Sequence, residues 1–182
     1  MNKLLPFVAS ALLALLAAIP SASAKALVTQ GSSELGVSGF LDIESALGTD
    51  VQFDLRYAYF FFDRFSLGLV GGFGDNDAAT RFDLSLAAEY NFALSDAYRP
   101  LVGTDFVPFL GVGVGVLYAD LYPGDETAAV FTGEAGAKFF LSDSAAVTLA
   151  LLGQLATDDV FADDQKATNV DLSLRLGMRF YF

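Results

Sequence analysis

Apolar residues recur at every second position through most of the chain after residue 33, and this alternation limits the fold more than any other feature. Side chains with a period of two lie on opposite faces of a β-strand, so each such segment has one apolar face and one polar or small-residue face. In Val51–Phe61, for example, every odd-numbered residue is large and apolar. The alternation occupies eight segments, within residues 34–43, 51–61, 65–73, 81–92, 109–118, 131–139, 147–154 and 170–182.

These segments predict a membrane-spanning barrel. The chain is 54% hydrophobic, yet after the N-terminal segment no apolar run reaches the roughly 20 residues that a spanning helix needs. Strands of about ten residues can cross a bilayer when tilted. In hydrocarbon an unpaired backbone group costs several kcal/mol, so the sheet must close. We therefore expect an all-β protein, a closed eight-stranded antiparallel up-and-down transmembrane β-barrel, as the single domain of residues 25–182.

The first 24 residues have the pattern of a secretory signal peptide. Lys3 gives a positive start, residues 4–19 form an apolar core, and Ala22-Ser23-Ala24 is a small-residue cleavage site. We expect this segment to be removed after export.

The connections fit one orientation of the barrel. Asp63-Arg64 and residues 141–145 are short turns, as expected on the periplasmic side, whereas residues 75–79, 119–128 and 156–168 are longer, polar external loops. Two connections depart from this rule: the external one at residues 45–50 is short, and the periplasmic one at residues 94–105 is long, for no reason visible in the sequence.

Alternation alone leaves a soluble, lipocalin-like ligand carrier as an alternative, because such a barrel has the same pattern inside out. The aromatic residues favour the membrane barrel, since they concentrate at strand ends, where an interfacial girdle is expected. The glycines at 111, 113 and 115 would make room inside a narrow barrel. The expected periplasmic girdle comprises residues 57–62, Phe65, Tyr90, Phe92, Phe139, Phe140 and residues 180–182, and the external one Phe73, Tyr118, Tyr122 and Phe131.

The C-terminal segment carries a resemblance to a known family. Arg175, Gly177, Phe180 and Phe182 lie in a final strand that ends on an aromatic residue, which looks like the terminal signal of outer-membrane barrels. Together with the signal peptide, the eight strands and the stretch Pro108–Gly113, this resembles the OmpX/OmpA-like superfamily of small barrels over essentially the whole mature chain. The resemblance implies the bacterial outer membrane as location, and recognition of the last strand by the barrel-assembly machinery.

The polar face places many charged residues inside the expected barrel. Eight strands enclose just enough room for side chains, so an open pore is not expected. Because unpaired buried charge is costly, we predict a connected salt-bridge network that plugs the interior. A gated ion path is the functional alternative. The predicted network comprises Glu34, Asp42, Asp54, Arg56, Arg81, Asp83, Glu89, Glu134, Lys138, Asp171, Arg175 and Arg179.

Composition excludes several functions. Without Lys3 the chain has 22 acidic and 9 basic residues, a net charge of −13, which disfavours nucleic acid as a partner. There is no Cys for disulfides, thiolate metal sites or a lipoprotein anchor. There is no His to act as a general base, so we expect no enzyme activity, no catalytic residues and no cofactor. Two groups of acidic loop residues are weak candidates for Ca²⁺ and are better explained by hydration: Asp75-Asn76-Asp77, and the cluster Asp158, Asp159, Asp163 and Asp164.

The sequence leaves the biological role open. The leading hypothesis is a monomeric structural protein of the outer membrane that supports envelope integrity and contacts lipid and lipopolysaccharide. The alternatives are a surface adhesin or binding module acting through its acidic external loops, a narrow channel and, as an outsider, the soluble carrier.

Overall fold

The computed structural model describes residues 28–45, 48–75, 79–92, 105–121, 124–163 and 166–182. The predicted signal peptide and most of the connection at 94–105 lie outside these residues. Side chains at 40–50, 79, 105, 121 and 162–167 are also outside the description.

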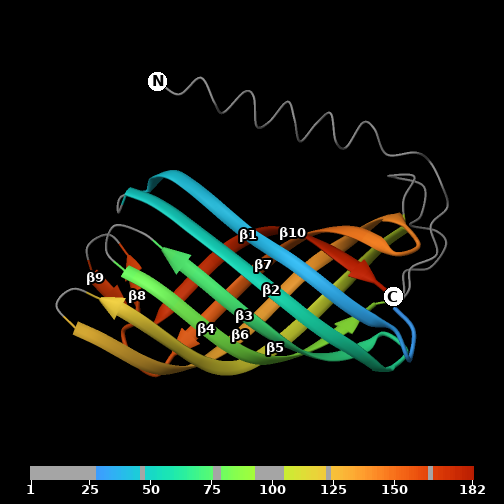
Figure 1. Ribbon diagram of the computed structural model, residues 1–182, viewed down its shortest axis with the longest axis horizontal. Coiled ribbons are helices and arrows are strands. Elements are labelled where there is room, and N and C mark those ends of the chain that lie inside the picture. Colours follow the sequence, from blue (N-terminus) through green and yellow to red (C-terminus); the bar gives the residue numbers. More distant parts are fainter. Residues whose placement is uncertain (1–27, 46–47, 76–78, 93–104, 122–123, 164–165) are drawn as a thin grey trace.

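The described residues form ten strands, most of which Figure 1 shows side by side in a barrel. No helix among the described residues has the length and apolar character that crossing a membrane requires. The strands are β1 (Ser33–Ser45), β2 (Gly48–Phe62), β3 (Phe65–Asp75), β4 (Ala79–Asn91), β5 (Asp105–Leu121), β6 (Gly124–Ser142), β7 (Ala145–Ala156), β8 (Phe161–Asp163), β9 (Lys166–Thr168) and β10 (Val170–Tyr181).

Eight of these strands close into an antiparallel barrel in the order β1-β10-β7-β6-β5-β4-β3-β2. Each strand pairs with its neighbours in sequence, and the first strand meets the last through Glu34 opposite Tyr181. This confirms the predicted fold class. Ser33 and Phe182 exchange backbone hydrogen bonds in both directions, so the start of β1 and the end of β10 lie at one end of the barrel. We call this the terminal end, and the opposite one the loop end.

The strands extend further toward the loop end than the sequence pattern predicted. Residues 119–128 were expected to form a loop, but β5 continues to Leu121 and β6 begins at Gly124, with Asp120 paired to Asp125. Polar residues can continue a ladder outside the apolar zone, because only the backbone is needed for pairing. The expected loop at 156–168 contains a small hairpin, in which β8 pairs with β9.

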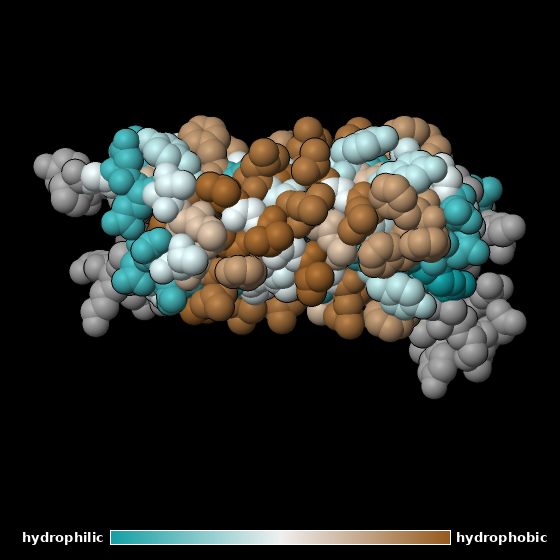
Figure 2. All heavy atoms as spheres, turned by 90° about the horizontal axis from the view of Figure 1, so that it is seen from below, coloured by the Kyte–Doolittle hydropathy of each residue, from teal (hydrophilic) through white to brown (hydrophobic). Residues whose placement is uncertain are grey.

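The outward face of the barrel is an apolar belt. Figure 2 shows brown side chains covering the middle of the molecule, with teal residues at both ends. Large apolar side chains such as Leu86, Val112 and Leu174 are more than 45% exposed, whereas charged side chains on the same strands, such as Glu89 and Arg179, are buried. This is the reverse of a soluble barrel, and it is the arrangement that a lipid solvent requires.

The predicted aromatic girdle was partly wrong. Tyr57, Phe62, Tyr90 and Phe182 face outward as expected. Three residues assigned to the girdle instead point inward and are buried, because the period of two continues through the aromatic runs: Phe60, Phe140 and Tyr181. Tyr122 lies outside the described residues.

Candidate functional site in the barrel interior

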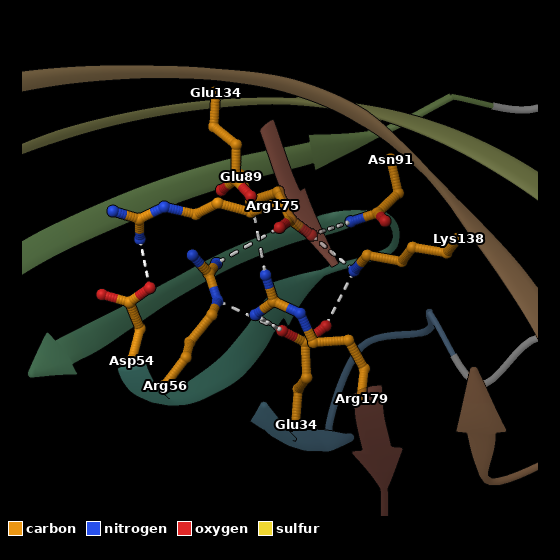
Figure 3. A network of polar contacts seen from close by, with 9 residues as sticks. All are labelled: Glu34, Asp54, Arg56, Glu89, Asn91, Glu134, Lys138, Arg175 and Arg179. Atoms are coloured by element: carbon orange, nitrogen blue, oxygen red, sulfur yellow. Dashed lines mark hydrogen bonds and ion pairs between the residues drawn. The ribbon is translucent and has the colours of Figure 1, made fainter. Parts of the chain in front are cut away.

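Five strands supply a cluster of charged residues near the terminal end. Glu34 is on β1, Arg56 on β2, Glu89 on β4, Lys138 on β6 and Arg179 on β10. Each occupies an inward position of its strand, and each is at least 95% buried. Figure 3 shows their charged groups converging from all sides. We call these five residues, with Glu134 and Asn91, the terminal-end network.

Glu34 and Lys138 are the centre of this network. Arg56 Nε donates to Glu34 Oε1 at 3.1 Å, and Arg179 Nη1 donates to the same oxygen at 2.9 Å. Lys138 Nζ donates to Glu34 Oε2 at 2.7 Å and to Glu89 Oε1 at 2.6 Å. Short charge-assisted bonds of this kind are among the strongest hydrogen bonds in proteins. They offset the large cost of removing these ions from water.

The edges of the network complete its charge balance. Arg179 Nη2 lies 3.8 Å from Glu134 Oε1, and Arg56 Nη2 lies 3.5 Å from Glu89 Oε2. Asn91 Nδ2 donates to Glu89 Oε1 at 3.0 Å. The carboxylates of Glu34, Glu89 and Glu134 therefore oppose the cations Arg56, Lys138 and Arg179. Equal numbers of each sign make the cluster neutral, as a buried group of ions must nearly be.

Aromatic rings surround the lysine where carboxylates do not. Lys138 Nζ lies 5.3 Å from the ring centre of Phe109, 5.5 Å from that of Tyr181 and 5.9 Å from that of Phe60. Ring faces attract cations, and the attraction is larger when the cation is desolvated. Lys138 is wholly buried, so these rings contribute to holding its ammonium group in place.

A second ion pair lies further along the barrel. Arg175 of β10 donates to Asp54 of β2, reaching past β1 to do so. Asp83 of β4 lies beside this pair, since a methyl group on Gly72 would collide with carboxylate oxygens of both Asp54 and Asp83. Two acids therefore share the neighbourhood of one arginine.

A polar cavity of about 50 Å³ lies around this second pair. It is lined by Ser38, Asp83, Glu134 and Thr132, and by the guanidinium-bearing side chains Arg175 and Arg179. A polar space of this size has room for a few water molecules.

Apolar side chains close both ends of the interior. At the terminal end, Val28 packs with Phe60, Val107, Phe140 and Tyr181. At the loop end the residues before and within β8 fold into the mouth, where Val160 and Phe161 are 0% and 2% exposed. They pack on Leu117, Ala119, Ala128, Val130 and Ala156, and the Arg81 guanidinium lies 5.9 Å from the centre of the Phe161 ring.

The charged residues predicted from the sequence thus fall into separate places. Six form the terminal-end network and two form the second pair. Asp83 borders the cavity, Arg81 lies over Phe161 at the loop end, and Asp171 is half-buried on β10. Asp42 lies outside the described side chains. Two features were not predicted from the sequence: the aromatic residues around Lys138, and the apolar side chains that close both ends of the interior. Strict alternation through Phe60 and Tyr181 puts these two rings on the inner face, so the aromatic residues could have been predicted from it.

The other predicted site residues lie on the surface or in the last strand. Asp158 and Asp159 are exposed, and Asp163 and Asp164 lie outside the described side chains. No group of three or more potential metal ligands occurs among the described residues. Of the predicted assembly signal, Phe180 and Phe182 face outward, while Arg175 and Gly177 face inward.

Comparisons with known proteins support the architecture. No protein-family model and no curated protein matches the sequence. The N-terminal β-barrel domain of Pseudomonas aeruginosa OprF matches the structure with a TM-score of 0.63 at 18% identity, over 84% of this chain and 98% of that chain. Neisserial surface protein A (NspA) matches with a TM-score of 0.60 at 14% identity, over 84% and 98%. The chain therefore has the fold of the small eight-stranded outer-membrane β-barrels, as its resemblance to the OmpX/OmpA-like superfamily implied.

Proposed function

We propose that the chain is an integral protein of the bacterial outer membrane, with a structural role in the envelope rather than a catalytic one. The observation that carries this proposal is the distribution of side chains in the closed barrel: apolar outside, charged and paired inside. A surface of this kind is stable only in lipid or detergent. The likeness to OprF and NspA supports the same location.

The contents of the barrel favour a plug over a conducting channel. An ion crossing the interior would have to pass the terminal-end network and both apolar closures. Disrupting a buried ion pair by removing one partner costs about 3–5 kcal/mol, so the interior is expected to stay closed.

The partners we propose follow from this location. The belt contacts membrane lipid, the acidic loop end faces the lipopolysaccharide layer, and the last strand is the segment recognised by the barrel-assembly machinery. The chain has 10 basic residues against 22 acidic ones, and this charge balance disfavours nucleic acid as a partner. We expect the barrel to act as a monomer, because its sheet is already closed.

The test is fractionation followed by gel mobility. The precursor is expressed in a Gram-negative host, and outer-membrane fractions are run on SDS gels with and without boiling. We expect a mature-sized band in that fraction whose mobility changes only on boiling, because a closed barrel resists the detergent. A soluble periplasmic band without a heat-dependent shift would overturn the proposal.

A second candidate role is surface binding, and the β5–β6 hairpin favours it. Residues 124–129 of β6 lie beyond the last paired position with β7, Val130, and their side chains include exposed Asp125 and Glu126. Shortening this hairpin would abolish cell or matrix binding without affecting the heat-dependent shift. Unchanged binding would contradict the surface-binding role, and only the structural role would remain.

A further inference from the structure

A short segment folds over the terminal end of the barrel before the chain enters β1. Residues 28–32 form a turn, in which Ser32 N donates to Thr29 O at 3.2 Å. The turn places Val28 against the apolar side chains that close this end, and Val28 is only 6% exposed. We call residues 28–32 the N-terminal strap.

Val28 differs from the other apolar side chains of its cluster. Five other described residues belong to this cluster, each on a strand of the barrel: Phe60, Val107, Phe140, Ala146 and Tyr181. Val28 precedes β1 and lies outside the barrel strands. Segments with few buried contacts open locally at a free energy well below that of global unfolding. Val28 can therefore leave the cluster while the eight strands stay paired.

The terminal-end network lies directly behind this cluster. The ring centres of Phe60 and Tyr181 lie 5.9 Å and 5.5 Å from Lys138 Nζ. Lys138 in turn binds two buried carboxylates of the network. Attraction between ions weakens as the local dielectric constant rises. Water that passed the aromatic rings would therefore hydrate these ions and loosen their pairing.

Few hydrogen bonds hold the outer part of the strap, and they go to the β2–β3 turn. Arg64 N donates to Val28 O at 2.8 Å, and Gln30 N donates to Asp63 Oδ1 at 2.9 Å. The side chain of Gln30 itself is exposed. Each hydrogen bond makes only a modest net contribution, so one buried valine and these bonds are what keep the strap closed.

The strap has a hinge where it joins β1. Gly31 N donates to Phe60 O, and Phe60 N donates to Ser32 O, both at 2.9 Å, so this part is fixed to β2. Gly31 has a φ of 91°, which residues with a side chain rarely adopt. A Cβ at this position would meet no atom within 4 Å. Gly31 is therefore needed for the shape of the backbone and not for space.

The β2–β3 turn also connects the strap to the network. Arg64 has a φ of 67°, and in this conformation its N–H faces Val28 O while its C=O faces Asn91. Asn91 N and Nδ2 both donate to Arg64 O, at 2.8 Å and 3.3 Å. Asn91 Nδ2 also donates to Glu89 Oε1 at 3.0 Å. A continuous series of hydrogen bonds thus joins the strap to a carboxylate of the network.

We propose that the N-terminal strap is a lid on the terminal end of the barrel, hinged at Gly31 and closed by Val28, whose opening admits water to the terminal-end network. In the closed position of this structure the lid keeps the ions of the network dry. In the open position it exposes them to solvent while the barrel remains paired. The lid depends only on contacts at this end of the barrel and goes beyond the envelope role proposed above.

The test is the labelling of a cysteine beneath the strap, which the absence of native Cys makes unambiguous. Ala146→Cys lies in the cluster of Val28, and Ala128→Cys, in the apolar cluster at the loop end, is the control. Both are treated with a small cationic methanethiosulfonate in nanodiscs. We expect Val28→Ser to speed labelling at position 146 about ten-fold or more, because burial of a valine favours the closed state by about that factor. Labelling at position 128 should not change.

Two further variants separate opening of the lid from general loosening. Gly31→Ala removes no buried contact but disfavours the φ of the hinge, so labelling at position 146 should rise about five-fold. Gln30→Ser changes an exposed side chain of the same strap and should have no effect. If neither Val28→Ser nor Gly31→Ala speeds labelling, the strap is not the lid. Equal acceleration at positions 146 and 128 would also overturn the proposal, because the whole barrel would then have loosened. The heat-dependent gel shift of each sample shows separately that the barrel has formed.

Discussion

At the scale of single residues, Lys138 is the position on which the interior depends most. Its ammonium group lies 2.7 Å from Glu34 Oε2 and 2.6 Å from Glu89 Oε1. No other cation of the described network lies within 3 Å of both carboxylates. Replacing Lys138 with Met keeps the volume similar but leaves two buried carboxylates with one fewer cation.

We expect Lys138→Met to lower the free energy of unfolding by about 3–5 kcal/mol, the cost of breaking a buried ion pair from one side. Urea titration of the detergent- or lipid-folded barrel, followed by the gel shift, measures this. In the double variant Lys138→Met/Glu89→Gln the loss should be smaller than in Lys138→Met alone, because one unpaired carboxylate is gone. A larger, additive loss would show that the two residues are not coupled.

Gly177 is a second residue with a defined requirement. A Cβ at this position would lie 2.7 Å from both Val37 O and Ser38 Cβ, and 2.9 Å from Thr148 Oγ1. The backbone oxygen cannot move without disturbing the ladder, so the space must stay empty.

Gly177→Ala is expected to destabilise the barrel by about 1–3 kcal/mol, the usual cost of overpacking. Gly133→Ala is the matched control on β6, since a Cβ there would meet no atom within 4 Å. Urea midpoints for the two variants should therefore differ clearly. If both alanines were tolerated alike, the close approach at Gly177 would not be rigid.

At the scale of elements, the segment before and within β8 is a plug rather than a free loop. Val160 and Phe161 place two apolar side chains against the inner faces of β5, β6 and β7. Burying an aromatic and a branched side chain stabilises the closed position by several kcal/mol.

Val160→Ala/Phe161→Ala is expected to release this plug and to speed proteolytic cleavage between β7 and β10 in the folded barrel. Proteolysis follows local opening, which becomes more frequent when packing is lost. Asp158→Ala/Asp159→Ala changes exposed residues of the same connection and should leave the cleavage rate unchanged. Equal cleavage of both variants would place the stabilisation outside the apolar contacts.

The elements also show what a sequence can and cannot reveal here. Alternation assigned Glu34, Lys138 and Arg179 to the inner face, because a period of two fixes the face of every residue in a strand. It could not say that these residues touch. They are 104 and 145 positions apart, and their meeting depends on the stagger between strands. Phe161 was out of reach for a similar reason, since only tertiary packing turns a polar connection inward.

At the scale of the whole molecule, the apolar belt determines where the protein can exist. Leu86 lies in the middle of β4 and is 54% exposed. Glu126 is exposed on β6, beyond its pairing with β7. The two positions compare lipid with water on one barrel.

Leu86→Arg should therefore reduce the free energy of unfolding in lipid by about 2–4 kcal/mol, the cost of an arginine near the bilayer midplane. Glu126→Arg should change it by less than about 1 kcal/mol, the value near an interface. Both variants are compared by equilibrium denaturation in liposomes. A similar small effect at both positions would mean that the belt does not face hydrocarbon.

The wide separation of the residues that meet in the terminal-end network also has a consequence for timing. Glu34 belongs to the first strand and Arg179 to the last, so a chain that arrives N-terminus first carries its central carboxylate through almost the whole of its assembly before the last cation is available. Contacts between such distant positions form slowly, because nearly the entire loop must be ordered before they add stability. Until then the interior ions are expected to stay hydrated, because burying them without their partners is costly. A partly assembled barrel is therefore less stable in the membrane than the closed one. The charges of the terminal-end network therefore balance only when the final strand, which carries Arg179, has been added.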